Sequence, residues 1–252
     1  MIDIILMGTA CASSGIGRDN TYILLKEEED CTLIDVGGNP LGKLKSLHIS
    51  TGQIKRLLIT HFHIDHIYGL PSLLWGMWID GRTEPLDIYC AEFNREWLEK
   101  WIEHLHMEQW PSLFEIRIST FDWKAQSKVW NNEELFISVF PSLHGVAPTV
   151  GVEVCYKNKL VVYSSDTILN PLLKKYEKID LFIHEATTAR EVIPSHSSLE
   201  GILNYYNLDT IEQLLLVHLM DDQPYNEVLN QLPADIFSKI TLGSDLLHVS
   251  LK

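Results

Sequence analysis

The chain has 252 residues, of which 46% are hydrophobic, and a formal net charge of −14 at pH 7. This length supports one substantial core, and no low-complexity tract or Pro/Gly/Ser linker interrupts it, so we expect a single domain over residues 1–252. The negative balance disfavours nonspecific binding to nucleic acid and to anionic membranes.

Cysteine usage and the first residues indicate the compartment. The four cysteines are widely scattered and none forms a CxxC pair, which disfavours a thiolate zinc site. A chain of this length needs no disulfide staples. Residues 1–10, MIDIILMGTA, have an early acid and no basic segment, so they predict a first strand rather than a signal peptide. No apolar run approaches the ~18 residues of a transmembrane helix. We therefore expect a cytoplasmic protein with reduced thiols and no membrane partner.

Two stretches with the same layout indicate an internal duplication. Residues 22–38 and residues 150–167 each read as strand, charged turn, strand and then an aspartate. Further along, IKRLLITHFH (54–63) is echoed by KIDLFIHEAT (178–187). Two similar β-rich halves that face each other would explain these echoes. The alternative is that any two hairpins look alike.

Five apolar, β-type runs end in side chains capable of metal binding or acid–base chemistry. RLLIT leads to His61, LFISVFPSL to His144, KLVVYSS to Asp166, DLFI to His184 and Glu185, and QLLLV to His218. Ligand sites in α/β sheets lie outside the carboxyl ends of the strands. The strand ends therefore predict one shared site.

Helices are predicted between these strands. One follows the first histidine cluster over residues 66–78. Another, over residues 92–107, places Phe93, Trp97, Trp101 and Leu105 at i, i+4, i+8 and i+12, which predicts an amphipathic helix with these side chains on its apolar face. A third begins near residue 197.

The most specific local signal is an HxHxDH motif directly after an apolar strand, formed by His61, His63, Asp65 and His66. Alternate residues of an extended segment point the same way, so the first two imidazoles can grip one ion. Asp65 and His66 follow a bend and can face a second ion. A polar cluster without metal is the competing interpretation, and the spacing favours the metal.

The motif and the later strand ends together resemble the metallo-β-lactamase-fold hydrolases over nearly the whole chain. The resemblance implies an α/β fold, a four-layer αβ/βα sandwich of two similar β-rich halves. It further implies that one metal takes His61, His63 and His144, that the other takes Asp65, His66 and His218, and that Asp166 bridges them. Asp35, in LIDVGG, matches the family's early aspartate, which supports the histidine loop from behind the ligands.

The ligand types indicate the metal. Imidazoles with few carboxylates and no thiolate suit two zinc ions, with manganese or iron as alternatives. Oxygen-reducing di-iron relatives of this fold carry a glutamate where His63 stands, which argues against redox chemistry. Two ions ~3.5–4 Å apart can hold a bridging hydroxide near neutral pH and clamp substrate oxygens, so we expect a hydrolase.

Two further motifs narrow the class of hydrolase. HEAT (184–187) and SHSS (195–198) resemble ribonuclease Z, the transfer-RNA 3′ endonuclease group, which carries an identical HEAT tetrapeptide and a downstream His-Ser-Thr. GLPSLL (69–74), GRTEPLDIY (81–89) and, more loosely, residues 8–20 also look like that group. The resemblance implies cleavage of phosphodiester bonds, with transfer-RNA 3′ processing as the family default.

His196 has a chemical rationale of its own. It precedes Ser197, the predicted helix N-cap, which stands in capping-box spacing with Glu200, and a helix N-terminus is a natural seat for phosphate. An imidazole there can protonate a leaving oxygen or stabilise transition-state charge. The helix dipole lowers its pKa, so it needs an acidic partner, a role that the resemblance gives to Glu185. We predict His196, Glu185 and Asp65 as catalytic residues, and we leave His184 as structural support.

One departure from the ribonuclease Z group concerns the substrate. Many members carry a long arm, rich in glycine and basic residues, between the third metal motif and the bridging aspartate, and this arm grips the transfer RNA. Here only residues 145–165 separate His144 from Asp166, and a hairpin fills them. Because phosphate contacts dominate nucleic-acid affinity, the chemistry transfers better than the macromolecular substrate.

Several readings of the substrate and partners follow. The substrate is a phosphodiester, either RNA or a small molecule such as a cyclic nucleotide. Hydrolysis of lactones, β-lactams or sulfate esters would leave the HEAT motif unexplained. A metal-holding sensor would need the complete ligand set without turnover. The resemblance also implies a homodimer built partly from the helix after His66, near residues 75–78.

Overall fold

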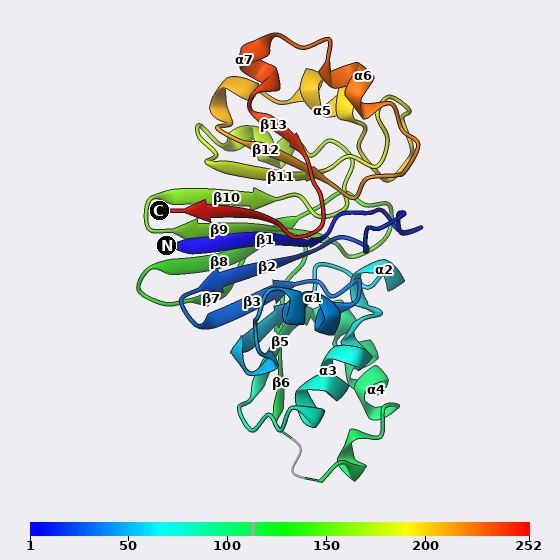
Figure 1. The fold of residues 1–252 in the computed structure, drawn as a ribbon, viewed down its shortest axis with the longest axis vertical. Coiled ribbons are helices and arrows are strands. Elements are labelled where there is room, and N and C mark those ends of the chain that lie inside the picture. Colours follow the sequence, from blue (N-terminus) through cyan, green and yellow to red (C-terminus); the bar gives the residue numbers. More distant parts are fainter. Residues whose placement is uncertain (112–113) are drawn as a thin grey trace.

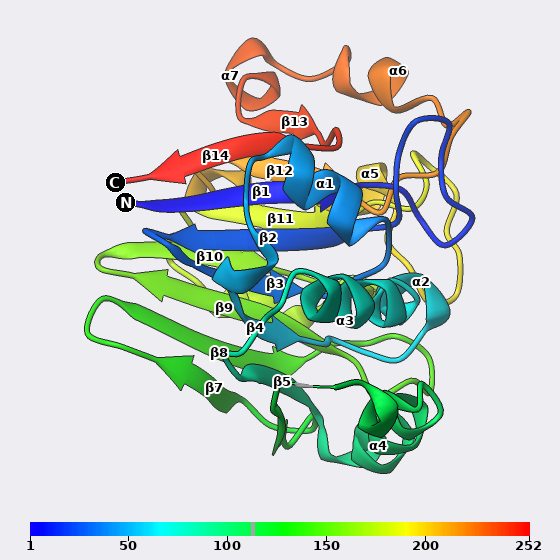
Figure 2. The ribbon, with the colours of Figure 1, turned by 60° about the horizontal axis from the view of Figure 1, so that its bottom comes forward.

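The computed structural model of the protein describes residues 1–111 and 114–252, and within these residues the strands form two seven-stranded sheets that face each other (Figures 1 and 2). The first sheet runs β14 (Leu247–Leu251), β1 (Ile2–Gly8), β2 (Tyr22–Glu27), β3 (Asp30–Ile34), β4 (Ile54–Leu58), β5 (Leu86–Ala91) and β6 (Ile116–Phe121). The second runs β13 (Ile240–Leu242), β12 (Leu214–Val217), β11 (Leu181–Glu185), β10 (Lys159–Tyr163), β9 (Val150–Tyr156), β8 (Leu135–Pro141) and β7 (Ser127–Asn131).

The two sheets are built the same way, which confirms the predicted pair of similar halves. In each, an antiparallel hairpin (β2–β3 or β9–β10) is followed by three strands added in parallel, β4 to β6 or β11 to β13. The last strand, β14, returns to the first sheet and pairs antiparallel with β1, with Ile2 opposite Leu251.

Helices cover the outer face of each sheet. On the first sheet lie α1 (Pro40–Ser46), α2 (Ile64–Ile67), α3 (Leu70–Ile79) and α4 (Arg95–Glu103), and on the second lie α5 (Leu199–Tyr205), α6 (Tyr225–Leu229) and α7 (Ala234–Phe237). Short 3-10 turns occupy Thr51–Gln53, Glu92–Asn94, Met107–Gln109, Pro171–Lys175 and Leu208–Thr210. Among the described residues, no helix has the length and apolarity to cross a bilayer.

Three hydrophobic layers separate the four layers of secondary structure. Strand β1 shows how: Ile4 and Leu6 face the second sheet, whereas Ile5 and Met7 face the helices. Because both faces of the sheet are covered, its strands are continuous apolar runs rather than alternating ones. The predicted αβ/βα sandwich is therefore confirmed.

The predicted apolar stripe around α4 is only partly confirmed: Trp101 and Leu105 pack against the core, whereas Phe93 and Trp97 do not. Phe93 and Trp97 are 64% and 65% exposed, whereas Leu98 is fully buried. The packed stripe is Leu98, Trp101, Ile102 and Leu105, at i, i+3, i+4 and i+7. The helix begins only at Arg95, and Phe93 lies in the 3-10 turn before it. Phe93 therefore does not share a helical face with the predicted residues of α4.

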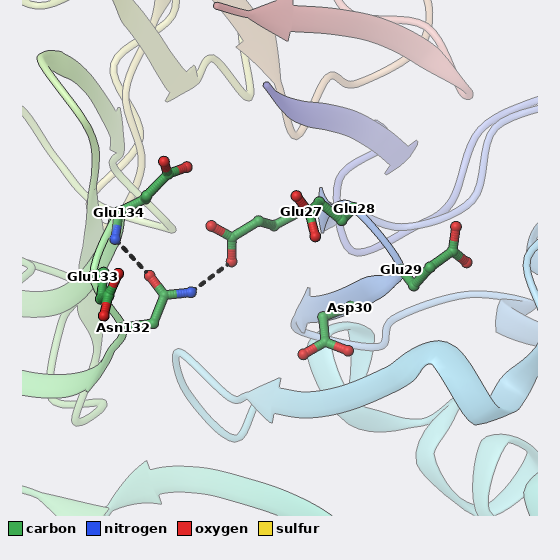
Figure 3. Close-up of a pocket in the computed structure, with 7 residues that line it drawn as sticks. All are labelled: Glu27, Glu28, Glu29, Asp30, Asn132, Glu133 and Glu134. Carbon is green, nitrogen blue, oxygen red and sulfur yellow. Dashed lines mark hydrogen bonds between the residues drawn. The ribbon is translucent and has the colours of Figure 1, made fainter.

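The turns at the amino end of β3 carry an acidic rim. Figure 3 shows Glu27–Asp30 of the β2–β3 turn beside Asn132–Glu134 of the β7–β8 turn, with Asn132 bridging to Glu27. Beneath the rim, buried Arg56 stacks its guanidinium 3.7 Å above the Trp130 ring and donates from Nε to the Thr32 hydroxyl. This buried cation joins the two sheets and offsets the charge of the rim.

We predict that Leu58→Ala lowers the free energy of unfolding by about 2–5 kcal/mol, because Leu58 is buried between the two sheets and its removal leaves a cavity there. Urea unfolding measures the change. Leu172→Ala is the matched control: Leu172 is 44% exposed, and its truncation should change stability by no more than about 0.5 kcal/mol. Equal losses in the two variants would contradict this assignment of the core.

Candidate active site

The carboxyl ends of the strands bring all seven predicted metal ligands together. His61 and His63 follow β4, Asp65 and His66 lie on α2, and His144, Asp166 and His218 follow β8, β10 and β12. They form two groups, His61, His63, His144 and Asp166, and Asp65, His66, Asp166 and His218, in each of which the ligand atoms lie within 4.8 Å of one another. Asp166 belongs to both groups, in the bridging position expected of it.

Unsatisfied atoms at the centre of these groups indicate what they hold. The Nε2 atoms of His61, His66 and His218 and Oδ1 of Asp166 are buried without a hydrogen-bond partner among the described residues. Leaving one such atom unpaired costs about 1–3 kcal/mol. Four in one place are best explained by a cation that all of them bind.

The spacing of the ligand atoms fits a transition metal. His66 Nε2 lies 3.4 Å from Asp166 Oδ1, His218 Nε2 lies 3.4 Å from Asp166 Oδ2, and His61 Nε2 lies 3.7 Å from the same oxygen. Ligands about 2.0–2.1 Å from a tetrahedral zinc ion are separated by roughly 3.3–3.4 Å. Imidazole and carboxylate without sulfur are donors that zinc accepts, so the residues fit two divalent metals.

The charge states of His61 and Asp65 also suit metal binding. Burial, together with the neighbouring His66, lowers the pKa of His61 well below its usual value, so this imidazole is neutral and its lone pair is free. Burial opposes ionisation of Asp65, but the adjacent imidazoles of His218 and His66 outweigh it and hold the pKa of Asp65 below its usual value. Neutral imidazoles and ionised carboxylates are the forms that bind metals.

Asp35 supports the histidine loop as expected. It is fully buried, and its Oδ2 accepts hydrogen bonds from His66 Nδ1 and from the Thr60 hydroxyl, both at 2.8 Å. Its Oδ1 accepts from the Thr60 backbone N–H at 2.7 Å. Because Nδ1 of His66 is engaged, Nε2 is left for the metal.

The backbone around the site is held in an uncommon conformation. Asp35, Ser165 and His218 have φ values of 63°, 51° and 56°, in the left-handed region that costs a non-glycine residue roughly 1–2 kcal/mol. Each stands at the carboxyl end of a strand. Such strain persists only where surrounding contacts fix the chain, and it gathers at functional sites.

His63 marks the open side of the site, beside the buried His144. His63 is exposed, and its Nδ1 lies 3.0 Å from Nε2 of His144. His144 Nδ1 donates to the Ser195 carbonyl at 2.7 Å. Because Ser195 directly precedes His196, one metal ligand is tied to the loop that carries the predicted proton donor.

His196 has the acidic partner expected of it. Its Nδ1 lies 2.9 Å from Glu185 Oε1, and its ring stacks on His218 with centroids 5.0 Å apart. Burial disfavours the charged imidazole, but the hydrogen bond and charge of Glu185, with Asp166 and Asp65, prevail and raise the pKa of His196 above its usual value. Nε2 is thereby left as the atom that can donate a proton.

The helix after His196 begins one residue later than predicted. Ser198, not Ser197, is the N-cap of α5, and its hydroxyl accepts from the Gly201 N–H. Ser197 instead donates its N–H to Glu185 Oε1 and its hydroxyl to the Thr167 carbonyl. The loop is therefore held by Glu185 rather than by a capping box.

His184 lies apart from the ligands. It is fully buried, its Nδ1 donates to the Glu185 carbonyl at 2.7 Å, and its Nε2 lies 3.3 Å from the Tyr206 hydroxyl. Burial lowers its pKa, which keeps the ring neutral. These contacts agree with a supporting position for this residue.

Sequence reasoning missed two threonines. Thr60 and Thr187 each place a hydroxyl between a carboxylate and a histidine of the metal groups. Their positions offered a weak signal, since Thr187 closes the HEAT motif and Thr60 directly precedes His61. A threonine at a strand end is too common to single out without the contacts.

Two facing sheets with paired His/Asp groups at their carboxyl edge are the architecture of the metallo-β-lactamase fold, with a candidate metal centre in its usual place. The structure of YhfI, a metallo-β-lactamase-fold protein from Bacillus subtilis, superposes with a TM-score of 0.82 over 98% of both chains at 16% identity. The short form of human tRNase Z gives 0.78 over 99% of both chains at 22% identity. Ribonuclease Z of Methanothermobacter thermautotrophicus is 23% identical over the whole chain and 97% of its own length.

The particular family is more specific than this class. The family described as Anti-Pycsar protein Apyc1 matches residues 2–239, and the chain belongs to it. The predicted resemblance to ribonuclease Z is confirmed by the relatives of that name. The Apyc1 family itself was not predicted from the sequence.

We predict that zinc stabilises the protein. A ligand that binds only the folded state adds about 2.7 kcal/mol when it is present at 100 times its Kd, so zinc added to chelator-treated protein should raise the thermal midpoint. Differential scanning calorimetry measures the shift, and Asp166→Ala, which removes the shared ligand, should reduce it. Identical midpoints with and without metal would contradict a metal centre at this position.

Proposed function

We propose that the protein is a cytoplasmic, dinuclear metal-dependent phosphodiesterase. The observation that carries this proposal is the juxtaposition of two ligand groups sharing Asp166 with a histidine, His196, held by a buried carboxylate beside them. When bound, two divalent ions, which we assign as zinc, would supply Lewis acidity to phosphate oxygens and lower the pKa of water.

The residues of the chain divide the remaining work. His61, His63 and His144 would hold one ion, Asp65, His66 and His218 the other, and Asp166 would touch both. His196 donates a proton from Nε2 to the leaving oxygen of the phosphodiester. Glu185 accepts from Nδ1 of His196, which fixes the ring orientation and favours its charged form.

Transfer-RNA 3′ processing is supported by the ribonuclease Z relatives, whose resemblance extends along the whole chain. In this reading the scissile phosphodiester belongs to a precursor transfer RNA. The HEAT tetrapeptide, which contains the partner of His196, belongs to the same resemblance.

Specific observations favour a small phosphodiester as a second candidate. A two-residue turn, Lys157–Asn158, joins β9 and β10, so no arm extends between His144 and Asp166. Two arginines in loops that flank the site are already paired, Arg18 with Asp221 and Arg190 with Glu200 and Glu227. A polyanion would find few free cations there.

Apolar side chains stand on the segments that carry the ligands and His196. Ile64, on α2, lies between His63 and Asp65, Val146 lies two residues after His144, and Val192 lies between the HEAT and SHSS motifs; all three are exposed. Apolar contacts suit a nucleobase better than a phosphate chain. A cyclic nucleotide combines one phosphodiester with one such base.

We expect His196→Ala to lower kcat by about 10²–10⁴-fold, since it removes the general acid. Metal content should stay at the wild-type level because the two ligand groups that share Asp166 do not include His196. Steady-state hydrolysis of a chromogenic phosphodiester measures the loss. His104→Ala is the control, because His104 is exposed at the carboxyl end of α4 and belongs to neither ligand group. Full activity in His196→Ala would refute the assignment.

The two substrate candidates are separated by one comparison. Purified, metal-loaded protein is given precursor transfer RNA or a cyclic nucleotide under the same conditions, and kcat/KM is measured for each. We expect the cyclic nucleotide to be preferred, because the chain lacks an arm. A preference for precursor transfer RNA would assign the protein to the endonuclease role instead.

We also propose that the protein forms a homodimer through α3 and α4. Trp75 and Ile79 on α3 and Trp97 on α4 are exposed, and Trp75 contacts Trp78 and Trp110 with ring centroids 4.8 Å apart. Aromatic residues are enriched in interface cores. A second copy of the chain would bury these side chains.

We predict a dimer for the wild-type protein at micromolar concentration and a monomer for Trp75→Glu, because a carboxylate in the interface core would lose its hydration. Sedimentation velocity measures both. Phe136→Glu, which changes a partly exposed aromatic side chain on β8, should stay dimeric. A monomeric wild-type protein would rule the dimer out.

A further inference from the structure

Behind the first ligand group, a threonine hydroxyl connects a histidine to a carboxylate. Thr60 Oγ1 lies 3.1 Å from His61 Nδ1 and donates to Asp35 Oδ2 at 2.8 Å. The same oxygen of Asp35 accepts from His66 Nδ1 at 2.8 Å. Ser165 donates its hydroxyl to Thr60 Oγ1 at 2.9 Å. One carboxylate thus serves two histidines, one directly and one through a threonine.

The second half of the molecule repeats this construction with different residues. Thr187 Oγ1 lies 2.8 Å from His218 Nδ1 and donates to Glu185 Oε2 at 2.9 Å. Glu185 Oε1 lies 2.9 Å from His196 Nδ1. Again one carboxylate serves one histidine directly and the other through a threonine. Apart from His196, which is partly exposed, all of these side chains are buried.

Counting protons fixes which group donates in each of the two series of hydrogen bonds from histidine through threonine to carboxylate. Asp35 and Glu185 accept hydrogen bonds from backbone N–H groups, as ionised carboxylates do, and a hydroxyl has a single proton to donate. Because Thr60 and Thr187 give that proton to Asp35 and Glu185, each must accept the proton of the neighbouring histidine. His61 and His218 therefore carry hydrogen on Nδ1. Their Nε2 atoms, buried without a partner among the described residues, then offer a lone pair.

The two constructions differ in one respect. Asp35 serves His61 and His66, both of which belong to the ligand groups. Glu185 serves His218, a ligand, and His196, which lies outside the seven ligands. Through Thr187, the carboxylate that orients the proton donor therefore also orients one metal ligand.

We propose that Thr60 and Thr187 are positioning residues, each of which locks one metal-binding histidine in the Nδ1–H tautomer. Thr187 in addition ties His218 and His196 to one carboxylate. The inference rests on the proposed function only in that His61 and His218 bind metal. According to this proposal, the two hydroxyl groups determine which ring nitrogen of His61 and of His218 binds the metal.

The test measures metal affinity rather than activity. Zinc binding to wild-type protein, Thr60→Val and Thr187→Val is followed by competition with a chromophoric chelator. Mutation of a group that orients a metal-bound histidine commonly costs 10–100-fold in affinity, so we expect each variant to lose about that much for one of its two zinc equivalents. Thr60→Ser and Thr187→Ser, which keep the hydroxyl, should restore wild-type affinity.

Thr149→Val is the matched control. Thr149 is fully buried, and its hydroxyl donates only to the Ala147 carbonyl, so its loss should leave both zinc affinities unchanged. Wild-type affinities in folded Thr60→Val and Thr187→Val would overturn the proposal. If wild-type protein itself binds no zinc, the proposed function is wrong. That outcome is distinguishable from unchanged zinc affinities in the two valine variants.

A second measurement uses only the wild-type protein, so it tests the proposal even when a valine variant fails to fold. Nitrogen-15 NMR of the imidazoles in zinc-loaded wild-type protein reports which ring nitrogen carries hydrogen. We expect Nδ1–H for both His61 and His218. An Nε2–H tautomer at either residue would overturn the assignment of its threonine.

Discussion

The buried carboxylate of Asp166 is the group on which the rest of the structure depends. Its two oxygens lie within 3.7 Å of imidazole nitrogens from His61 and His66 on one half and from His144 and His218 on the other. A lone anion at this depth would be very costly. The facing sheets, the strained strand ends and the carboxylates behind the histidines all keep that one anion opposite groups that can share a cation with it.

Local pattern predicted the ligands because the chemistry concentrates in short motifs at strand ends. The spacing of His61, His63, Asp65 and His66 is readable without a structure, and the HEAT motif led to Glu185. Two of the failures depended on neighbours distant in sequence. Ser197 looked like a helix cap, yet it is held by Glu185, and the cap moved to Ser198. Thr60 and Thr187 were invisible because a hydroxyl acquires its role only from the atoms on either side of it. The stripe around α4 was predicted only in part: Phe93 lies in the 3-10 turn before the helix, and Leu98 rather than Trp97 faces the core.

Charge is distributed unevenly along the sandwich. The acidic rim of Glu27–Asp30 and Glu133–Glu134 lies at the amino end of β3, whereas the metal groups lie at the carboxyl ends of the parallel strands. With two divalent ions bound, the molecule would have a negative end and a locally positive cleft. An anionic substrate would then be turned toward the cleft by the field of the whole protein, an effect that weakens as salt screens it.

The pairing of β14 with β1 has a practical consequence. It joins the first and last residues of the chain, with Ile2 beside Leu251, and Figure 1 shows both ends on the side away from α2 and the loops of the active site. A short linker between the two ends would therefore close the chain into a ring without crossing the cleft. New ends could then be opened at the β7–β8 turn, and a label, a solid support or a fused partner placed at either of the present ends would leave access to the metals unhindered.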